Sequence, residues 1–303
     1  MAPTLRQGDR LGAATRHRQA FLRNHKTCAF CGGGAPSSTI EHCPPRALFQ
    51  HRQWPEGFEF PACQACNNGS SNHDLVIAML ARMDPFENKG DLDGAAVGLM
   101  KAAHRQHPEL LQNMMMRANQ ARRANRELGL RPRPGQTHQD TLLANVTDEM
   151  RKAVEVFAGK LAKAIYYMHA DTIFPADGSL VMCWCTNTDL LRHGKFQLFE
   201  VVKDVPGEAP HLIRSGKFLN DQFEYKFSLS DEQHLFALQA RFGNAFGLIV
   251  FGATTPGLLE QHIRRLECTI AREDEGPFRI LQSTVLPLGL RPVGMHLESD
   301  NSP

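Results

Sequence analysis

Two C-x-x-C pairs are the part of this sequence whose residue types and spacing most directly indicate chemistry. They are Cys28-Ala-Phe-Cys31 and Cys63-Gln-Ala-Cys66. Each pair can place two thiolates on one tight turn, and two such turns complete the tetrahedral sulfur shell that Zn²⁺ favours. Glycines at 32–34 permit the positive φ that the first turn needs. We therefore predict a structural zinc ion bound by these four cysteines.

The remaining cysteines do not share this pattern. A thioredoxin-type redox pair would need a C-x-x-C at the head of a helix in a βαβ unit, and neither pair has that context. The other four cysteines lack partner spacing and are expected to be small buried apolar residues. They are Cys43, Cys183, Cys185 and Cys268.

Acidic, imidazole and amide side chains lie close to the two cysteine pairs in the sequence. Glu41-His42 occurs between the pairs and is followed by Cys43-Pro44, and Asn67 directly follows the second pair. Hydrolysis of a phosphodiester with a single metal ion needs a base that activates water. It also needs oxygen ligands for Mg²⁺ or Mn²⁺, which stabilises the leaving oxyanion. These residues would place the base and the oxygen ligands on one small structural unit that is held together by zinc.

This pattern resembles the HNH endonuclease family, the ββα-metal (treble-clef) nucleases, in the branch that carries two C-x-x-C zinc knuckles. The resemblance covers about residues 25–80. It implies that His42 is the general base that deprotonates the attacking water, and that Glu41 and Asn67 bind the catalytic Mg²⁺ or Mn²⁺. It also implies a metal-dependent hydrolase that cleaves nucleic acid, with DNA as the expected substrate.

Other functions stay open on the sequence alone. The middle Asn of the family pattern has no counterpart, because residues 43–62 contain no Asn. The alternatives are a catalytically inactive zinc module that binds nucleic acid or a protein partner, and a zinc fold with a purely structural role. Arg46 is a candidate phosphate contact, since a guanidinium matches two phosphate oxygens at once. The competing interpretation is a solvent-facing arginine after a Pro-Pro turn.

Charge is segregated along the chain, although the formal net charge is only +2. Residues 1–27 carry a net charge of +5 and residues 101–135 one of +6, whereas residues 28–100 carry −4 and residues 136–303 carry −5. Two basic segments therefore flank the cysteine pairs, as expected if a polyanion such as nucleic acid is held near them. Solvated faces of ordinary surface helices are the alternative explanation.

Composition limits the class of protein. With 303 residues, 42% hydrophobic and 22% charged, the chain has the composition of a globular protein of roughly two domains. No apolar run reaches the length of a membrane span, and early charges exclude a secretory signal peptide. We therefore expect a cytoplasmic protein with no membrane partner, in which cysteines serve metal or redox chemistry rather than disulfides.

Hydrophobic periodicity predicts the secondary structure. We expect a loop-and-hairpin module over residues 28–72 and a proline-containing linker at 131–136. The predicted helices span residues 13–24, 74–83, 108–128, 143–168 and 256–266. The predicted strands, in a mostly antiparallel sheet, span residues 179–186, 195–202, 222–229 and 246–252.

These elements predict an α+β protein: a small zinc-stapled ββα (treble-clef) module, a helical middle, and a C-terminal, mostly antiparallel sheet with helices. We expect the C-terminal half to serve recognition, homodimerisation or sensing, as in defence or mobile-element nucleases of the family. The predicted segments are a basic N-terminal helix at 1–24, the nuclease-like module at 25–84, a helical basic segment at 85–130, a linker at 131–140, the α+β domain at 141–296 and a tail at 297–303.

Overall fold

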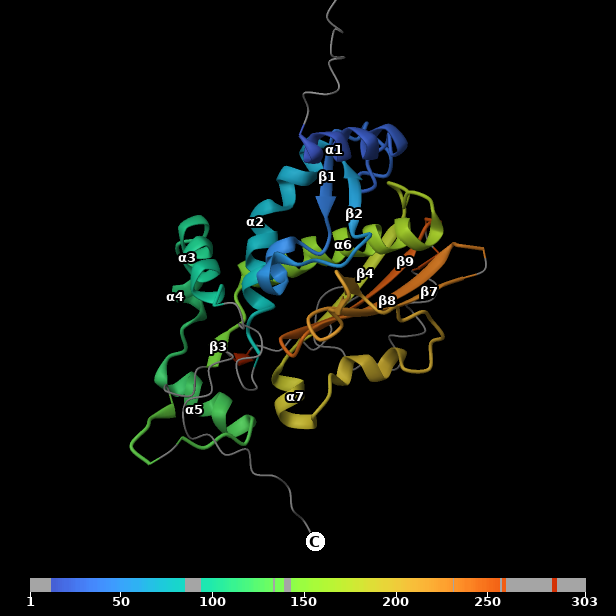
Figure 1. Cartoon of the computed structure of the whole chain (residues 1–303). Coiled ribbons are helices and arrows are strands. Elements are labelled where there is room, and N and C mark those ends of the chain that lie inside the picture. The colour runs from blue at the N-terminus through green and yellow to red at the C-terminus, as the bar shows by residue number, and fades with distance from the viewer. Residues whose placement is uncertain are drawn as a thin grey trace, which may run out of the picture.

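The protein combines helices and strands around one long central helix, α6 (Asp148–Ala170). Figure 1 shows α6 running through the middle, with helix α2 (Gln64–Leu80) and the hairpin of β1 (Thr39–His42) and β2 (Glu59–Ala62) on one side and a sheet on the other. This arrangement confirms the α+β class. The structure, a computed structural model, describes residues 12–84, 94–132, 134–138, 143–230, 232–256, 258–259 and 285–287.

The N-terminal elements build a small ββα unit. Strands β1 and β2 pair antiparallel, with Thr39 opposite Ala62 and His42 opposite Glu59. Helix α1 has the predicted bounds. The elements are α1 (Ala13–Asn24), β1 (Thr39–His42), the 3₁₀ helices η2 (Arg46–Leu48) and η3 (Gln50–Arg52), β2 (Glu59–Ala62) and α2 (Gln64–Leu80).

Helix α2 begins at Gln64, not at residue 74 as predicted. Cys63 caps it, because its sulfur accepts a hydrogen bond from the backbone N–H of Cys66. The second cysteine pair therefore lies at the helix start, and the polar run that was expected to be loop forms the first turns of the helix. The C-terminal half of α2 is buried, as its apolar composition predicts.

The described part of the middle segment contains the helices α3 (Ala96–Gln106), α4 (Leu110–Met114) and α5 (Ala118–Glu127). The single helix predicted over residues 108–128 is therefore wrong. The chain becomes extended at Met115, with φ −68° and ψ 127°, and Met115 forms a β-bridge with Ala144. This tertiary pairing outweighs the local helical pattern.

The central helix begins later than its apolar periodicity suggests. Leu143 belongs to a short strand, β3 (Leu143–Asn145), which pairs antiparallel with β10 (Val285–Pro287). Thr147 then caps α6, because its side chain accepts a hydrogen bond from the N–H of Met150 at 3.2 Å. Such a cap sets the start of a helix where an apolar pattern alone does not.

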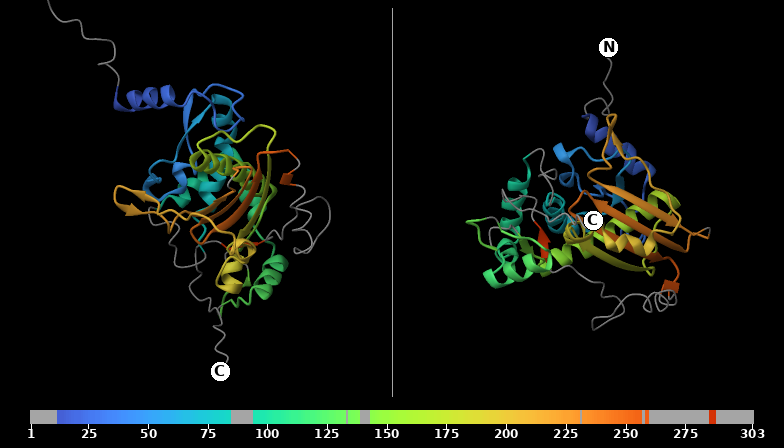
Figure 2. Two further views of the ribbon diagram at one scale, coloured as in Figure 1. Left: turned by 90° about the vertical axis from the view of Figure 1, so that its right-hand side faces the viewer. Right: turned by 90° about the horizontal axis from the view of Figure 1, so that it is seen from below.

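The C-terminal sheet has the strand order β4-β9-β8-β7 and is antiparallel throughout. The strands predicted at 179–186, 222–229 and 246–252 are confirmed, and β8 is an additional strand. Figure 2 shows the sheet together with α6, which packs against β4 and β9. The strands are β4 (Ser179–Thr186), β7 (Glu224–Leu229), β8 (Leu235–Phe242) and β9 (Phe246–Ala253).

The strand predicted over residues 195–202 is wrong. This segment follows helix α7 (Thr188–His193) and forms the 3₁₀ helix η6 (Gln197–Val202). Its apolar side chains pack beside the sheet, where Phe199 and Val202 join the cluster around Cys183 and Ile249. The helix predicted at 256–266 and the tail at 297–303 lie largely or wholly outside the described residues, as does Cys268.

A two-stranded hairpin of β5 (Ile213–Arg214) and β6 (Lys217–Phe218) extends from the C-terminal half toward the N-terminal unit. The left view of Figure 2 shows it projecting on the side that carries the N-terminal elements. Its backbone bonds the loop before β2, since the N–H of Glu56 donates to the carbonyl of Ile213 at 3.0 Å. The two halves of the chain therefore meet at this hairpin. Among the described residues, no helix combines the length and apolarity needed to cross a bilayer.

Candidate functional site

The four predicted zinc ligands converge. The sulfur atoms of Cys28, Cys31, Cys63 and Cys66 all lie within 4.8 Å of one another. A tetrahedral zinc ion with Zn–S bonds of about 2.3 Å holds its sulfurs about 3.8 Å apart, so the group has the size of a metal site. These four cysteines could therefore hold a metal ion.

Local backbone geometry presents these sulfurs to one point. The N–H of Phe30 lies 3.4 Å from the sulfur of Cys28, and the N–H of Cys66 lies 3.5 Å from that of Cys63. Gly32 follows the first pair with φ +64°, and a Cβ there would lie 2.4 Å from the backbone nitrogen of Ala176. Only glycine fits both the turn and the loop that packs on it.

The crowding of these thiols favours a bound cation. Burial and neighbouring thiol groups raise the pKa of Cys31 and of Cys66. Hydrogen bonding to the Cys66 N–H lowers the pKa of Cys63. Close thiolates repel one another, and a divalent ion removes that repulsion and displaces their protons. The donor set therefore fits a soft divalent metal, of which zinc is the predicted one.

Glu41, predicted to bind a catalytic metal, contacts a lysine instead. Its Oε1 accepts a hydrogen bond from the Nζ of Lys160, on α6, at 2.9 Å. Both side chains are buried, at 7% exposure for Lys160 and 9% for Glu41. Burial raises the pKa of Glu41, while the lysine charge acts in the opposite direction. Glu41 thus joins strand β1 to the central helix.

Two side chains of α2 complete the environment of this ammonium group. The Nζ of Lys160 also donates to Ser70 Oγ at 2.7 Å and to Asp74 Oδ2 at 2.8 Å. An ammonium has three donors, so all three are used. Burial acts to lower the pKa of Lys160, but nearby acidic groups, first Cys43 and then Asp74 and Glu41, outweigh it and raise the pKa.

Asn67 faces the same side of β1. Its Nδ2 donates to the hydroxyl of Thr39 at 3.1 Å, and Thr39 lies two residues before Glu41 on the strand. A divalent ion on Glu41 and Asn67 does not fit this arrangement. The carboxylates of Glu41 and Asp74 already neutralise a buried lysine, and a second cation would have to displace it.

His42 lies apart from Glu41, because successive strand residues face opposite sides. Its Nε2 lies 3.4 Å from Oε1 of Glu59, its partner across the hairpin. The ring packs edge-on against Trp54, with centroids 4.8 Å apart. The structure therefore does not bring the predicted base together with the two predicted catalytic-metal ligands.

Two guanidinium groups accompany His42. Arg46, from η2, lies 5.1 Å from the ring centroid of Trp54, and Arg214, from the β5–β6 hairpin, lies 4.2 Å from it. Burial and then the Arg46 charge lower the pKa of His42, Arg214 adds to this, and Glu59 acts to raise it. The imidazole is consequently held in its neutral form more strongly than a free histidine.

A second histidine shares the same carboxylate. The Nε2 of His17, on α1, lies 3.4 Å from Oε2 of Glu59, the oxygen that His42 does not contact. His17 is 59% exposed, whereas His42 is only 20% exposed. We call the group of His17, His42, Arg46, Glu59 and Arg214, together with Trp54, which contacts His42 and both arginines, the His42 cluster.

Most partners in these two groups were not predicted from the sequence. Glu59 could have been found only from the hairpin register, and Arg214 is far away in the sequence. Lys160 carried a usable signal, because it is a charged residue within the buried apolar face of α6, near Phe157 and Leu161. A charge on such a face usually has a buried partner.

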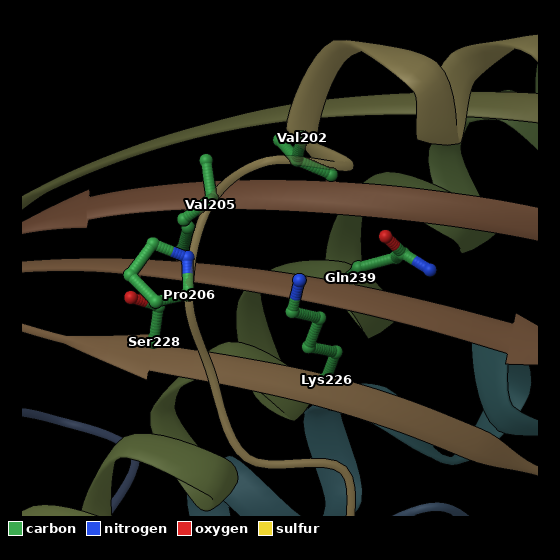
Figure 3. A pocket seen from close by; sticks show the side chains of 7 residues that line it. Val202, Val205, Pro206, Lys226, Ser228 and Gln239 are labelled. Atoms are coloured by element: carbon green, nitrogen blue, oxygen red, sulfur yellow. The ribbon is translucent and has the colours of Figure 1, made fainter.

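Hollows elsewhere on the protein offer other candidate sites. A small one on the sheet, lined by Val202, Lys226 and Gln239 among others (Figure 3), has a volume of about 10 Å³, which is room for about one water molecule. A second, of about 500 Å³, is lined mainly by polar residues of α5 and the segment after it, including Arg122, Arg126 and Arg131. The second one carries part of the basic segment predicted from the sequence.

No protein-family model matches the chain, no curated protein matches it, and no solved structure matches it.

Proposed function

We propose that the chain is a nuclease, in which an HNH-like, treble-clef zinc module cleaves phosphodiester bonds in nucleic acid and His42 is the general base. The observation that carries this proposal is the His42 cluster: an imidazole against a carboxylate, with two arginines beside it. Arginine matches phosphate oxygens in pairs and stabilises the charge that develops on them during cleavage.

Glu59 gives the imidazole a defined role. When Nε2–H donates toward the carboxylate, the lone pair is left on Nδ1, which then accepts a proton. Burial and the arginine charges, which lower the pKa of His42, keep this form populated at neutral pH. The arrangement supports His42 as a base, as the family resemblance implies.

This proposal keeps the predicted zinc ion but not the predicted catalytic Mg²⁺ or Mn²⁺. A zinc ion bound by the four cysteines would connect the turn at Cys28 and Cys31 to the start of α2. It would thereby hold β1 and β2, which lie between these cysteines in the sequence, in place. The predicted Mg²⁺ or Mn²⁺ on Glu41 and Asn67 does not fit beside Lys160, and we assign no step to it. The C-terminal half supplies Arg214, which supports a part for that half in substrate recognition.

Cleavage assays test the proposal. Zinc-loaded protein is incubated with end-labelled single- and double-stranded DNA and RNA, each with Mg²⁺, with Mn²⁺ or with neither. We expect cleavage in at least one mixture and a loss on the order of 10²–10⁴-fold for His42→Ala, the usual contribution of a general base. His193→Ala, which changes an exposed histidine of α7, is the matched control. Full activity of His42→Ala would refute this role.

A second candidate function is nucleic-acid binding without turnover. The observation that favours it is Lys160, which fills the position between Glu41 and Asp74 and leaves no place for the predicted ion. Fluorescence anisotropy with increasing salt tests it. If Arg122 and Arg126 contact phosphates, their replacement by alanine lowers the slope of log K against log salt by about 0.7–0.9 for each contact. Binding of this kind with no cleavage in any mixture would select this function.

A further inference from the structure

We propose that the His42 cluster cleaves RNA without a divalent catalytic metal, and that His17 is the general acid. In this reaction the 2′-hydroxyl group of the RNA attacks the neighbouring phosphate. This inference rests on the proposed nuclease function and specifies its substrate. Its first support is the pair of imidazoles on one carboxylate. Glu59 turns Nε2 of His42 toward one oxygen and Nε2 of His17 toward the other.

Because both rings contact the same carboxylate, both direct the same nitrogen atom, Nε2, toward it. Each ring directs Nε2 to Glu59 at 3.4 Å and leaves Nδ1 for a substrate. The two rings belong to different elements, α1 and β1, and each contacts a different oxygen of Glu59. A base and an acid on either side of one phosphate are what cleavage by proton transfer alone requires.

The second support is the lysine in the neighbouring cluster. The carboxylates that would bind a catalytic ion hold Lys160, so a metal-activated water is not available from them. RNA does not need one, because its 2′-hydroxyl is a nucleophile already attached beside the phosphate. Arg46 and Arg214 supply the positive charge that the pentacoordinate phosphate requires.

The step balances within the substrate and the two histidines. Nδ1 of His42 takes the proton of the 2′-hydroxyl as O2′ forms a bond to phosphorus. The bond from phosphorus to O5′ of the next nucleotide breaks, and that oxygen takes a proton from His17. The products are a 2′,3′-cyclic phosphate and a 5′-hydroxyl. Proton exchange with water then restores both histidines.

A single ribonucleotide placed in a DNA strand tests the substrate assignment. The zinc-loaded 303-residue chain, freed of excess metal by gel filtration, is given this oligonucleotide and its all-DNA twin. We expect cleavage only after the ribose, a 2′,3′-cyclic phosphate end, and no requirement for added Mg²⁺ or Mn²⁺. Cleavage of both strands only after a divalent ion is added would overturn this inference and leave the nuclease proposal standing. No cleavage under any condition would refute both this inference and the proposed nuclease function.

His17→Gln tests the acid separately, and because His17 is exposed the fold should tolerate the change. We expect a loss on the order of 10²-fold or more on the ribose-containing strand. The loss should largely disappear on uridine 3′-(4-nitrophenyl phosphate), because nitrophenolate departs without a proton. Equal losses of cleavage activity on both substrates, or no loss on either, would show that His17 is not the general acid. His104→Gln, at an exposed position of α3, is the control.

Discussion

The ammonium of Lys160 lies 2.9 Å from the carboxylate of Glu41, although 119 residues separate them in the chain. This buried contact joins the central helix to the strand that also carries His42. Because adjacent strand residues face opposite sides, Glu41 is held in the interior while His42 faces the cluster with Glu59. The strand therefore has a structural side and a candidate chemical side.

Replacement of Lys160 by methionine should destabilise the protein strongly. It leaves Glu41 and Asp74 buried without their cation, and loss of one partner of a buried ion pair costs about 3–5 kcal/mol. Urea unfolding, followed by circular dichroism, measures the change in the free energy of unfolding. Lys152→Met, at an exposed position of the same helix, should change it by less than about 0.5 kcal/mol. Similar values for the two variants would contradict the assigned role of Lys160.

Removal of the lysine side chain should also create a site for a divalent ion. In Lys160→Ala the oxygens of Glu41, Ser70 and Asp74 surround a vacated position, and oxygen ligands suit Mn²⁺. The buried Oδ1 of Asp74 has no hydrogen-bond partner among the described residues and adds a further ligand. Electron paramagnetic resonance with Mn²⁺ should detect binding to zinc-loaded Lys160→Ala and none to the parent. Binding to the parent that Glu41→Gln abolishes would show that the metal role first expected for Glu41 is right.

Zinc content should follow the four clustered cysteines. Cys63→Ser should lower the bound zinc from one ion per chain and reduce thermal stability, since the binding free energy of a structural metal is part of the folding free energy. Elemental analysis of the purified variants measures the content. Cys183→Ala, outside the cluster in the C-terminal sheet, should retain the ion. A full zinc content in Cys63→Ser would exclude this sulfur as a ligand.

The titration of His42 should respond to its charged neighbours in a defined direction. Burial, Arg46 and Arg214 lower its pKa and Glu59 raises it, with a net decrease below the usual value of about 6.5. Arg46→Ala removes a positive charge and should raise the pKa, whereas Glu59→Gln should lower it further. NMR titration of the imidazole resonances measures both changes without any need for activity. Arg105→Ala, at an exposed position of α3, should leave the titration unchanged.

The cysteine site was predictable because its signal is local. The C-x-x-C spacing brings each pair onto one turn, and the helix that starts at the second pair presents those sulfurs to the first. The candidate base was also proposed from a local pattern, Glu41-His42. That pattern was insufficient for the metal ligands, since strand alternation turns Glu41 away from its neighbour and into the interior.

The partners of these residues were not predictable, because they come from distant elements. Arg214 reaches Trp54 from a hairpin whose two strands have only two residues each, too short for a period-two pattern to reveal them. Met115 shows the same limit in the fold, because a bridge to Ala144 interrupts a helix that local periodicity favours. In each case a contact between remote segments decides the outcome.

The contribution of Lys160 and Arg214 to the N-terminal unit has a consequence for the newly made protein. Chains are synthesised from the N-terminus, so β1, β2 and α2 leave the ribosome well before residues 160 and 214 are added. During that interval Glu41 has no lysine and His42 lacks one of its two arginines. The site is therefore incomplete in the nascent chain. It is assembled only after most of the chain has been translated.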